Sequence, residues 1–347
     1  MFMKPGRAEI PELGLQKEFQ SAAPETTRPE NLKQAVGSFE NFALSFKPNI
    51  NPSDFKKDID YRIRAAELFA NKSKEEVEKL VIHQHTDMPD IRLLYGIHEL
   101  ITRDLIEENV VEGRSYLTHE KNLAQLQRTI EFQQNFTRFI IQNRTMSGLD
   151  TVMQKYWSIY ENISYRITKN PEAARKNENG IEHAVTASQI LEERGWRTLK
   201  PRIKDDMKNG IDGYATGTTL SGKEIILATQ FKTNYSEQPI VSVEVLYPFP
   251  LATDIDEDAW DLVANIKELR LKNLQLPLFP VLMRVPSSYQ TAHILKGTGL
   301  LDSPQSMNAL LDEKAKKALE YAEILADAKI EKPKPNKKKV IYVPQAK

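Results

Sequence analysis

The feature that most constrains the fold is a change in hydrophobic spacing near Asn170. Before this residue, apolar side chains recur every three or four positions, as in amphipathic helices, and predict helices at 89–108, 118–142 and 147–167. After it, short segments alternate apolar and polar residues, as strands do. The sequence therefore predicts a mixed α/β (α+β) fold, in which a helical N-terminal domain precedes a mixed β-sheet domain flanked by helices.

The region after Asn170 is expected to run helix, three or four strands, helix, strand. Gly195 is expected to end the first helix, and a turn around Gly222 is expected to join two of the strands. The predicted helices are 181–194 and 256–271, and the predicted strands are 196–199, 211–216, 224–232, 239–246 and 278–285.

Four segments follow from these patterns and from the distribution of proline and charge. Residues 1–50 are polar and rich in proline, and are expected to form an extended leader with one short helix. Residues 51–170 form the all-helical domain and residues 171–300 the sheet domain. Residues 301–347 are expected to hold an amphipathic helix, at 308–328, and a basic tail of lysine and proline.

Composition excludes several kinds of chemistry. The chain has no cysteine, so disulfides, thiolate nucleophiles and cysteine-ligated zinc or iron–sulfur sites are absent. The 48 basic and 48 acidic residues balance, but residues 332–347 hold six lysines and no acid, which leaves 42 basic and 48 acidic residues elsewhere. A chain whose body is not basic contacts nucleic acid only locally or with the help of metal ions.

Neither a membrane span nor a cleaved signal is expected. No run approaches the roughly 18 consecutive apolar residues of a spanning helix. The first residues bring in acid and proline before any apolar core forms, unlike a signal peptide. We therefore expect a cytoplasmic protein without a membrane partner, with export lacking a cleaved signal as the open alternative.

Four polar residues are candidates for a catalytic site: Glu182, Asp212, Gln230 and Lys232. Residues two apart on a strand point to the same face, so Gln230 and Lys232 are expected side by side. If the two strands pair across Gly222, Asp212 lies beside them. Glu182, expected near the start of the preceding helix, would add a second carboxylate.

This set suits metal-assisted hydrolysis of a phosphodiester bond. Asp212 would ligate Mg²⁺ or Mn²⁺, hard ions that prefer oxygen ligands. The side-chain oxygen of Gln230, the backbone carbonyl of Phe231 and Glu182 are further candidate ligands. Lys232 would orient the attacking water and stabilise charge on the phosphate.

The same residues resemble the PD-(D/E)XK nuclease superfamily, and within it the Mrr-like restriction-endonuclease branch with a Q-x-K motif. IEHAVTASQILEERGW is similar to the first motif of that family, and NGIDGYATG and IILATQFKTN are similar to its Asp strand and its (D/E)-x-K strand. The resemblance covers roughly residues 180–285. Two positions depart from the family pattern, with Gln230 in place of the commoner acid and Ile211 in place of proline.

The resemblance implies that Glu182, Asp212, Gln230 and Lys232 are the catalytic residues of a Mg²⁺-dependent nuclease. It implies a nucleic-acid partner, with DNA favoured over RNA. The helical domain would then select the substrate or bind a protein partner.

Two alternatives stay open. The first is a non-catalytic protein that uses a degenerate nuclease fold to bind protein or nucleic acid. The second is a histidine-based metal hydrolase built on His83, His85 and Asp87, which needs both histidines on one strand. A polar loop between helices is the preferred interpretation of that string.

Overall fold

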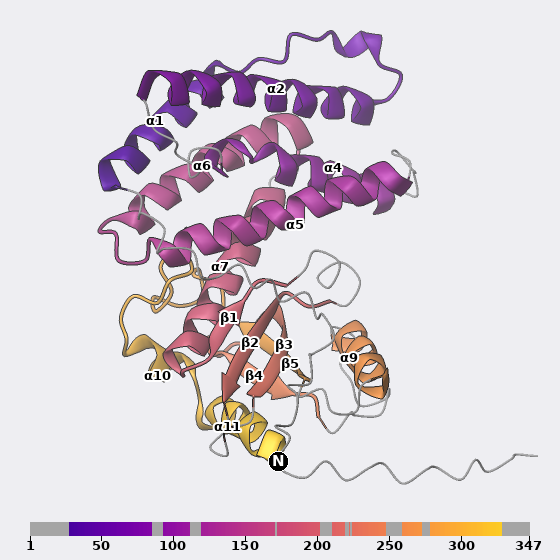
Figure 1. Cartoon of the computed structure of the whole chain (residues 1–347). Coiled ribbons are helices and arrows are strands. Elements are labelled where there is room, and N and C mark those ends of the chain that lie inside the picture. Colours follow the sequence, from indigo (N-terminus) through magenta and orange to yellow (C-terminus); the bar gives the residue numbers. More distant parts are fainter. Residues whose placement is uncertain are drawn as a thin grey trace, which may run out of the picture.

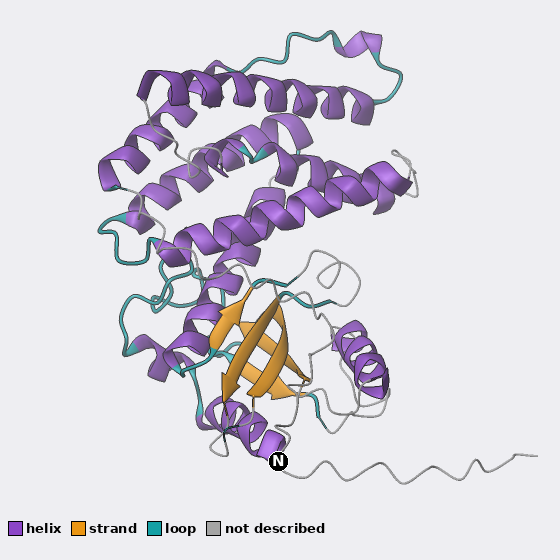
Figure 2. Ribbon diagram, viewed as in Figure 1, coloured by secondary structure: helices purple, strands orange, loops and turns teal. Residues whose placement is uncertain are grey.

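The structure is a computed structural model, and it describes residues 28–84, 93–111, 119–170, 172–201, 210–218, 222, 224–247, 259–272 and 278–327. Within these residues the chain forms nine α-helices, one short 3₁₀ helix at Pro52–Asp54 and one five-stranded mixed sheet (Figures 1 and 2). The prediction of a mixed α and β fold is confirmed. The basic tail at 332–347 lies outside the described residues.

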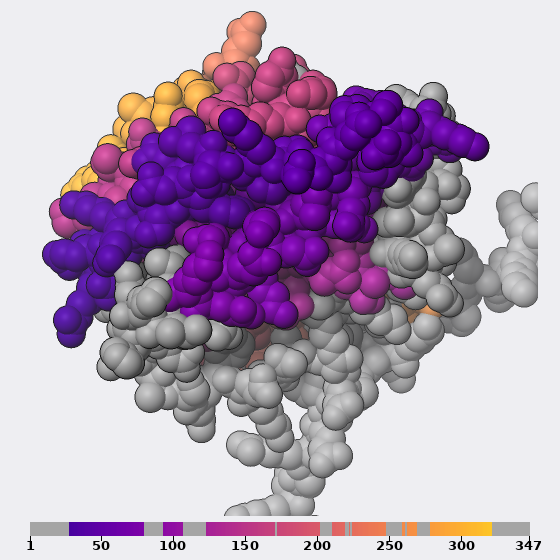
Figure 3. Space-filling model, turned by 90° about the horizontal axis from the view of Figure 1, so that it is seen from above, coloured from indigo at the N-terminus to yellow at the C-terminus, as the bar shows by residue number. Residues whose placement is uncertain are grey.

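Five helices form a helical layer at one end of the molecule. They are α1 (Pro29–Ser45), α2 (Asp58–Gln84), α4 (His98–Val111), α5 (His119–Gln142) and α6 (Leu149–Thr168). Their shared core is aromatic, since Phe39, Phe69, Phe136 and Tyr156 are among its fully buried side chains. Figure 3 looks down on this layer and shows the N-terminal helices, indigo to violet, spread across its outer face.

Helix α1 is longer than the one short helix expected within the leader at residues 1–50, of which residues 1–27 lie outside the described residues. It runs for 17 residues and buries Leu32, Val36 and Phe39 at helical spacing in the core of the helical layer. Pro29 stands in its first turn, where a proline costs no helical hydrogen bond. Pro29 therefore marks a helix start, and the polar composition around it concealed the apolar stripe.

Helix α7 (Ala173–Glu193) connects the helical layer to the sheet (Figure 1). Ile181 and Val185 belong to the core of the helical layer, whereas Ile190 and Leu191 belong to the core against the sheet. The helix begins at Ala173 rather than at residue 181, so Glu182 lies in its middle and not near its start. Side chains of one helix thus hold both parts of the fold together.

The sheet orders its strands β1-β2-β3-β5-β4. Strands β3 and β5 are parallel and every other neighbouring pair is antiparallel. A parallel pair needs a long crossover connection, and here it includes α9 (Trp260–Lys272). The strands are β1 (Arg197–Leu199), β2 (Gly213–Thr218), β3 (Glu224–Thr233), β4 (Ser242–Val245) and β5 (Leu278–Val285).

The two faces of the sheet carry different helices. Ile226 and Ala228 of β3 pack with Leu262 and Ile266 of α9. Alternate β3 residues, such as Leu227, face the core that includes α7 and the C-terminal helix α11 (Glu313–Asp327). This alternation follows from the two-residue period of a strand and explains why β3 reads as an unbroken apolar run.

The C-terminal helix expected at 308–328 is divided into α10 (Ser306–Leu310) and α11. Leu311 is buried and forms an isolated bridge with Val241, which takes it out of the helix. The Asp312 carboxylate then accepts the N–H of Ala315, at 2.7 Å, and caps α11. None of the helices in the described part of the chain is long and apolar enough to cross a membrane.

Candidate functional site

A cleft of about 1480 Å³ lies between α5, α7 and the near edge of the sheet. It is larger than the roughly 300–1,000 Å³ of a typical small-molecule pocket. Six basic and four acidic residues line it, so its local charge is positive although the whole chain is neutral. The basic residues are Arg103, Arg138, Arg175, Lys176, Lys200 and Lys232, and the acidic ones are Asp104, Glu172, Glu192 and Asp212.

Asp212 lies on the sheet wall of this cleft, directly before β2. Its N–H donates to the carbonyl of Thr229 at 2.9 Å, and its Oδ2 accepts the N–H of Phe231 at 2.6 Å. Gly213 makes this close approach possible, because a Cβ there would lie 2.9 Å from Thr229 Oγ1 and 3.2 Å from the Phe231 ring. The Asp-Gly pair thus fixes a carboxylate against β3.

Gln230 and Lys232 lie two residues apart on β3 and so share a strand face, but only Lys232 lines the cleft. Lys232 lines the cleft near the end of β3, whereas Gln230 is 8% exposed and is not among the lining residues. Gln230 shares a strand face with Ala228, which packs toward α9. Its Oε1 is buried and has no hydrogen-bond partner among the described residues. Gln230 therefore lies between Thr229 and Phe231, the two β3 residues that hydrogen-bond to Asp212, and its side-chain oxygen is an unpaired acceptor.

Glu182 is not brought to the cleft. Its side chain is 1% exposed, and its Oε1 accepts the N–H of Gly297 at 2.5 Å. The neighbouring Gly299 packs so closely on the Glu182 backbone that a Cβ would collide with it. Burial raises the pKa of Glu182, partly offset by hydrogen bonds from the chain around Ser288 and Gly297. Of the four predicted site residues, the cleft thus holds Asp212 and Lys232.

His183 is the cleft residue that sequence reasoning missed. It follows the predicted Glu182 in the sequence, is 4% exposed and lines the cleft. Its Nε2 is buried and has no partner among the described residues. Burial lowers the pKa of His183 to about 4, so the imidazole is neutral at pH 7. His183 lies about 100° around α7 from Glu182, so the segment at Gly297 and Gly299 that covers Glu182 leaves His183 on the cleft side.

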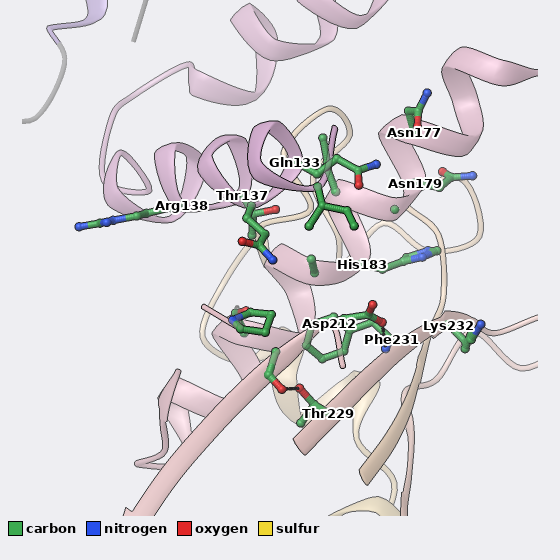
Figure 4. A pocket seen from close by; sticks show the side chains of 18 of the residues that line it. Gln133, Thr137, Arg138, Asn177, Asn179, His183, Asp212, Thr229, Phe231 and Lys232 are labelled. Atoms are coloured by element: carbon green, nitrogen blue, oxygen red, sulfur yellow. Dashed lines mark hydrogen bonds between the residues drawn. The ribbon is translucent and has the colours of Figure 1, made fainter. Parts of the chain in front are cut away.

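Figure 4 shows how these residues face one another. Asp212 and Lys232 lie on the sheet wall, and His183 and Asn179 project from α7 above them. Residues 179 and 183 are one helical turn apart, so they share a face of α7. The buried Oδ1 of Asn179 also lacks a partner among the described residues. Two unused polar atoms therefore lie on the wall opposite Asp212, where a polar ligand would satisfy them.

The described residues offer fewer oxygen ligands for a divalent cation than the sequence predicted. In the described part of the chain, no three His, Cys, Asp or Glu side chains group closely enough to hold a metal. Mg²⁺ can, however, bind through one or two carboxylates completed by waters and substrate phosphates. The carboxylate of Asp212 and the unused amide oxygen of Gln230 fit that kind of site. The contribution expected from Glu182 does not.

The histidine-based alternative finds no support in the geometry of α2. His83 lies within α2, a helix, and not on the strand that two chelating histidines would need. His85 and Asp87 lie outside the described residues.

Comparisons with protein-family models, with curated proteins and with solved structures found no match to this chain.

Proposed function

We propose that this chain is a metal-dependent nuclease of the PD-(D/E)XK type, which hydrolyses a phosphodiester bond in the cleft between α5, α7 and the sheet. One observation carries the proposal. A carboxylate, Asp212, is fixed by the Phe231 N–H on the cleft wall that also presents Lys232. The element order α7, β1, β2, β3, β4, α9, β5 supports it, because the sequence motif runs through the same helix and strands, with β3 and β5 parallel.

Each residue of the cleft has a distinct role in this proposal. Asp212 and Gln230, with the backbone carbonyl of Phe231, would hold Mg²⁺ or Mn²⁺. The ion, when bound, supplies Lewis-acid activation of water and neutralises charge on the phosphate. Lys232 binds the reacting phosphate and stabilises the negative charge that develops on it. Neutral His183 offers Nε2 to the same group from the opposite wall.

The helical layer forms the second wall of the cleft. Side chains of α5, among them Gln133, Thr137 and Arg138, line the cleft opposite the sheet (Figure 4). A positively lined cleft in a neutral chain directs a polyanion to this one place. We expect DNA in preference to RNA, and a protein partner bound by the helical layer would act from outside the cleft.

A second candidate function is binding without hydrolysis. Two observations favour it, namely the reduced set of metal donors and the burial of Glu182 beneath the segment around Gly297. In that case the cleft would hold nucleic acid, and Asp212 would act only to shape the sheet edge.

Cleavage of labelled substrates separates the two functions. Duplex DNA, single-stranded DNA and RNA would each be incubated with Mg²⁺ or Mn²⁺ and the wild-type chain, with Lys232→Ala, or with a control, Lys267→Ala. Lys267 is an exposed residue of α9 outside the cleft. Hydrolysis predicts cutting by the wild type and the control that is lost in Lys232→Ala. Binding of a substrate without any cutting would favour the second function.

A further inference from the structure

Tyr235 is an exposed aromatic residue at the cleft. It is 89% exposed, the highest value among the large hydrophobic side chains of the described residues. It also lines the cleft, three residues after Lys232. An exposed aromatic ring at a cleft offers a flat apolar face on which another ring can stack.

The backbone on either side of Tyr235 is held in place. Asn234 is 93% buried by its neighbours and anchors the turn through both its backbone and its side chain. Four hydrogen bonds do this: Asn234 N–H to the Val285 carbonyl (2.8 Å), Asn234 Nδ2 to the Ile240 carbonyl (2.6 Å), Ser236 N–H to Asn234 Oδ1 (2.9 Å) and Gln290 Nε2 to the Asn234 carbonyl (3.1 Å). The ring is thus presented by an ordered turn rather than by a loose one.

We infer that Tyr235 is a stacking platform for an unpaired base, and that the cleft takes single-stranded nucleic acid. The inference rests on the proposed function, since it assumes that nucleic acid enters this cleft. In a duplex the faces of the bases are already stacked on one another, so an exposed ring can stack only on a base that is unpaired or at a strand end. Lys232, close by on the same strand end, faces the backbone phosphate of the stacked nucleotide.

The cleft lining is consistent with a single strand. A non-specific single-strand site combines basic residues that follow the backbone with aromatic rings that take the bases. Arg175 and Lys176 line the α7 end of the cleft and Lys232 lines the sheet end, with Phe231 and Tyr235 beside Lys232. The cleft therefore carries basic side chains on both walls and aromatic rings beside the lysine of the sheet wall.

Binding without catalysis tests the inference. The dissociation constant of a fluorescently labelled single strand of about 15 nucleotides would be measured by anisotropy in EDTA, so that no cleavage occurs. The wild type would be compared with Tyr235→Ala, Tyr235→Phe and a control, Tyr165→Ala. Tyr165 is 52% exposed on α6 and does not line the cleft. Thermal unfolding of each variant would verify that it is folded.

We expect Tyr235→Ala to weaken single-strand binding by about 5- to 100-fold, the range for loss of one stacked base. Tyr235→Phe and Tyr165→Ala are expected to bind as the wild type does, and the weaker affinity for duplex DNA is expected to be unchanged in all three. Wild-type affinity in Tyr235→Ala, an equal loss for duplex, or no binding of single strands by the wild type would overturn the inference. Stacking found in EDTA without cleavage in Mg²⁺ would contradict the proposed hydrolysis alone.

Discussion

Replacement of Glu182 distinguishes a structural carboxylate from a catalytic one. Glu182 stands where the resemblance to PD-(D/E)XK nucleases implies a catalytic acid, yet in the structure it is buried and accepts the N–H of Gly297. Glu182→Ala removes that acceptor and leaves a buried donor unpaired, at a cost of about 1–3 kcal/mol. The cavity left by the lost side-chain atoms adds about 1–2 kcal/mol. The free energy of unfolding should therefore fall by about 2–5 kcal/mol.

Glu182→Gln should behave differently. The amide oxygen of glutamine can still accept the Gly297 N–H, and the substitution removes a buried group whose negative charge opposes that of Glu178. Its stability should lie within about 1 kcal/mol of the wild type.

Urea unfolding gives the free energies, and cleavage per folded molecule gives the activity. We expect Glu182→Gln to retain wild-type cleavage, because Glu182 does not reach the cleft. A Glu182→Gln protein that is as stable as the wild type but does not cleave would refute this reasoning and return Glu182 to the catalytic set. Equal destabilisation by alanine and glutamine would refute the role given to the Gly297 hydrogen bond.

Two further predictions follow from buried groups on α7. Burial, with repulsion from Glu182, raises the pKa of Glu178 from 4.5 to about 8, so the folded chain keeps a proton that the unfolded chain releases. The free energy of unfolding of the wild type should fall as pH rises from about 4.5 to about 8, whereas that of Glu178→Gln should not. The difference between the two free energies should therefore grow to a few kcal/mol by pH 8. A difference that does not change with pH in urea unfolding would contradict this. His183→Asn should lower the cleavage rate by about 10-fold or more, because the contact of Nε2 with the substrate is lost. His293→Asn, outside the cleft, should cleave as the wild type does, and an equal effect of both changes on the rate would contradict a direct role for His183.

The sheet could be predicted from the sequence because its signals are local. Gly195 has a φ of +85° and ends α7, and Gly222 has a φ of +79° in the segment between β2 and β3, so both glycines act where they were expected to. The apolar runs of β3 and β5 are also local signals, since each run is bounded by polar or glycine-containing segments. The pairing of Asp212 with β3 followed from the hairpin.

The composition of the cleft could not be predicted in the same way. Which residues of α7 reach the cleft depends on the segment around Gly297 and Gly299, which lies more than 100 residues later in the chain. That segment covers Glu182 and leaves His183 to the cleft. The direction of Gln230 depends likewise on α9, which fills the face that this residue shares with Ala228. Long-range packing of this kind leaves no local pattern in the sequence.

The most direct measurement of the central claim is the metal dependence of cleavage in Asp212→Asn. Asparagine keeps the size of the side chain and an oxygen that can accept the Phe231 N–H, so the fold should be retained while the negative charge is lost. The rate of cutting would be followed as Mg²⁺ is added, for the wild type and for Asp212→Asn prepared in the same way. Our account predicts that cutting by the wild type rises with Mg²⁺ and is abolished by EDTA, and that Asp212→Asn does not cut at any Mg²⁺ concentration. Cutting by Asp212→Asn at the wild-type rate would contradict it.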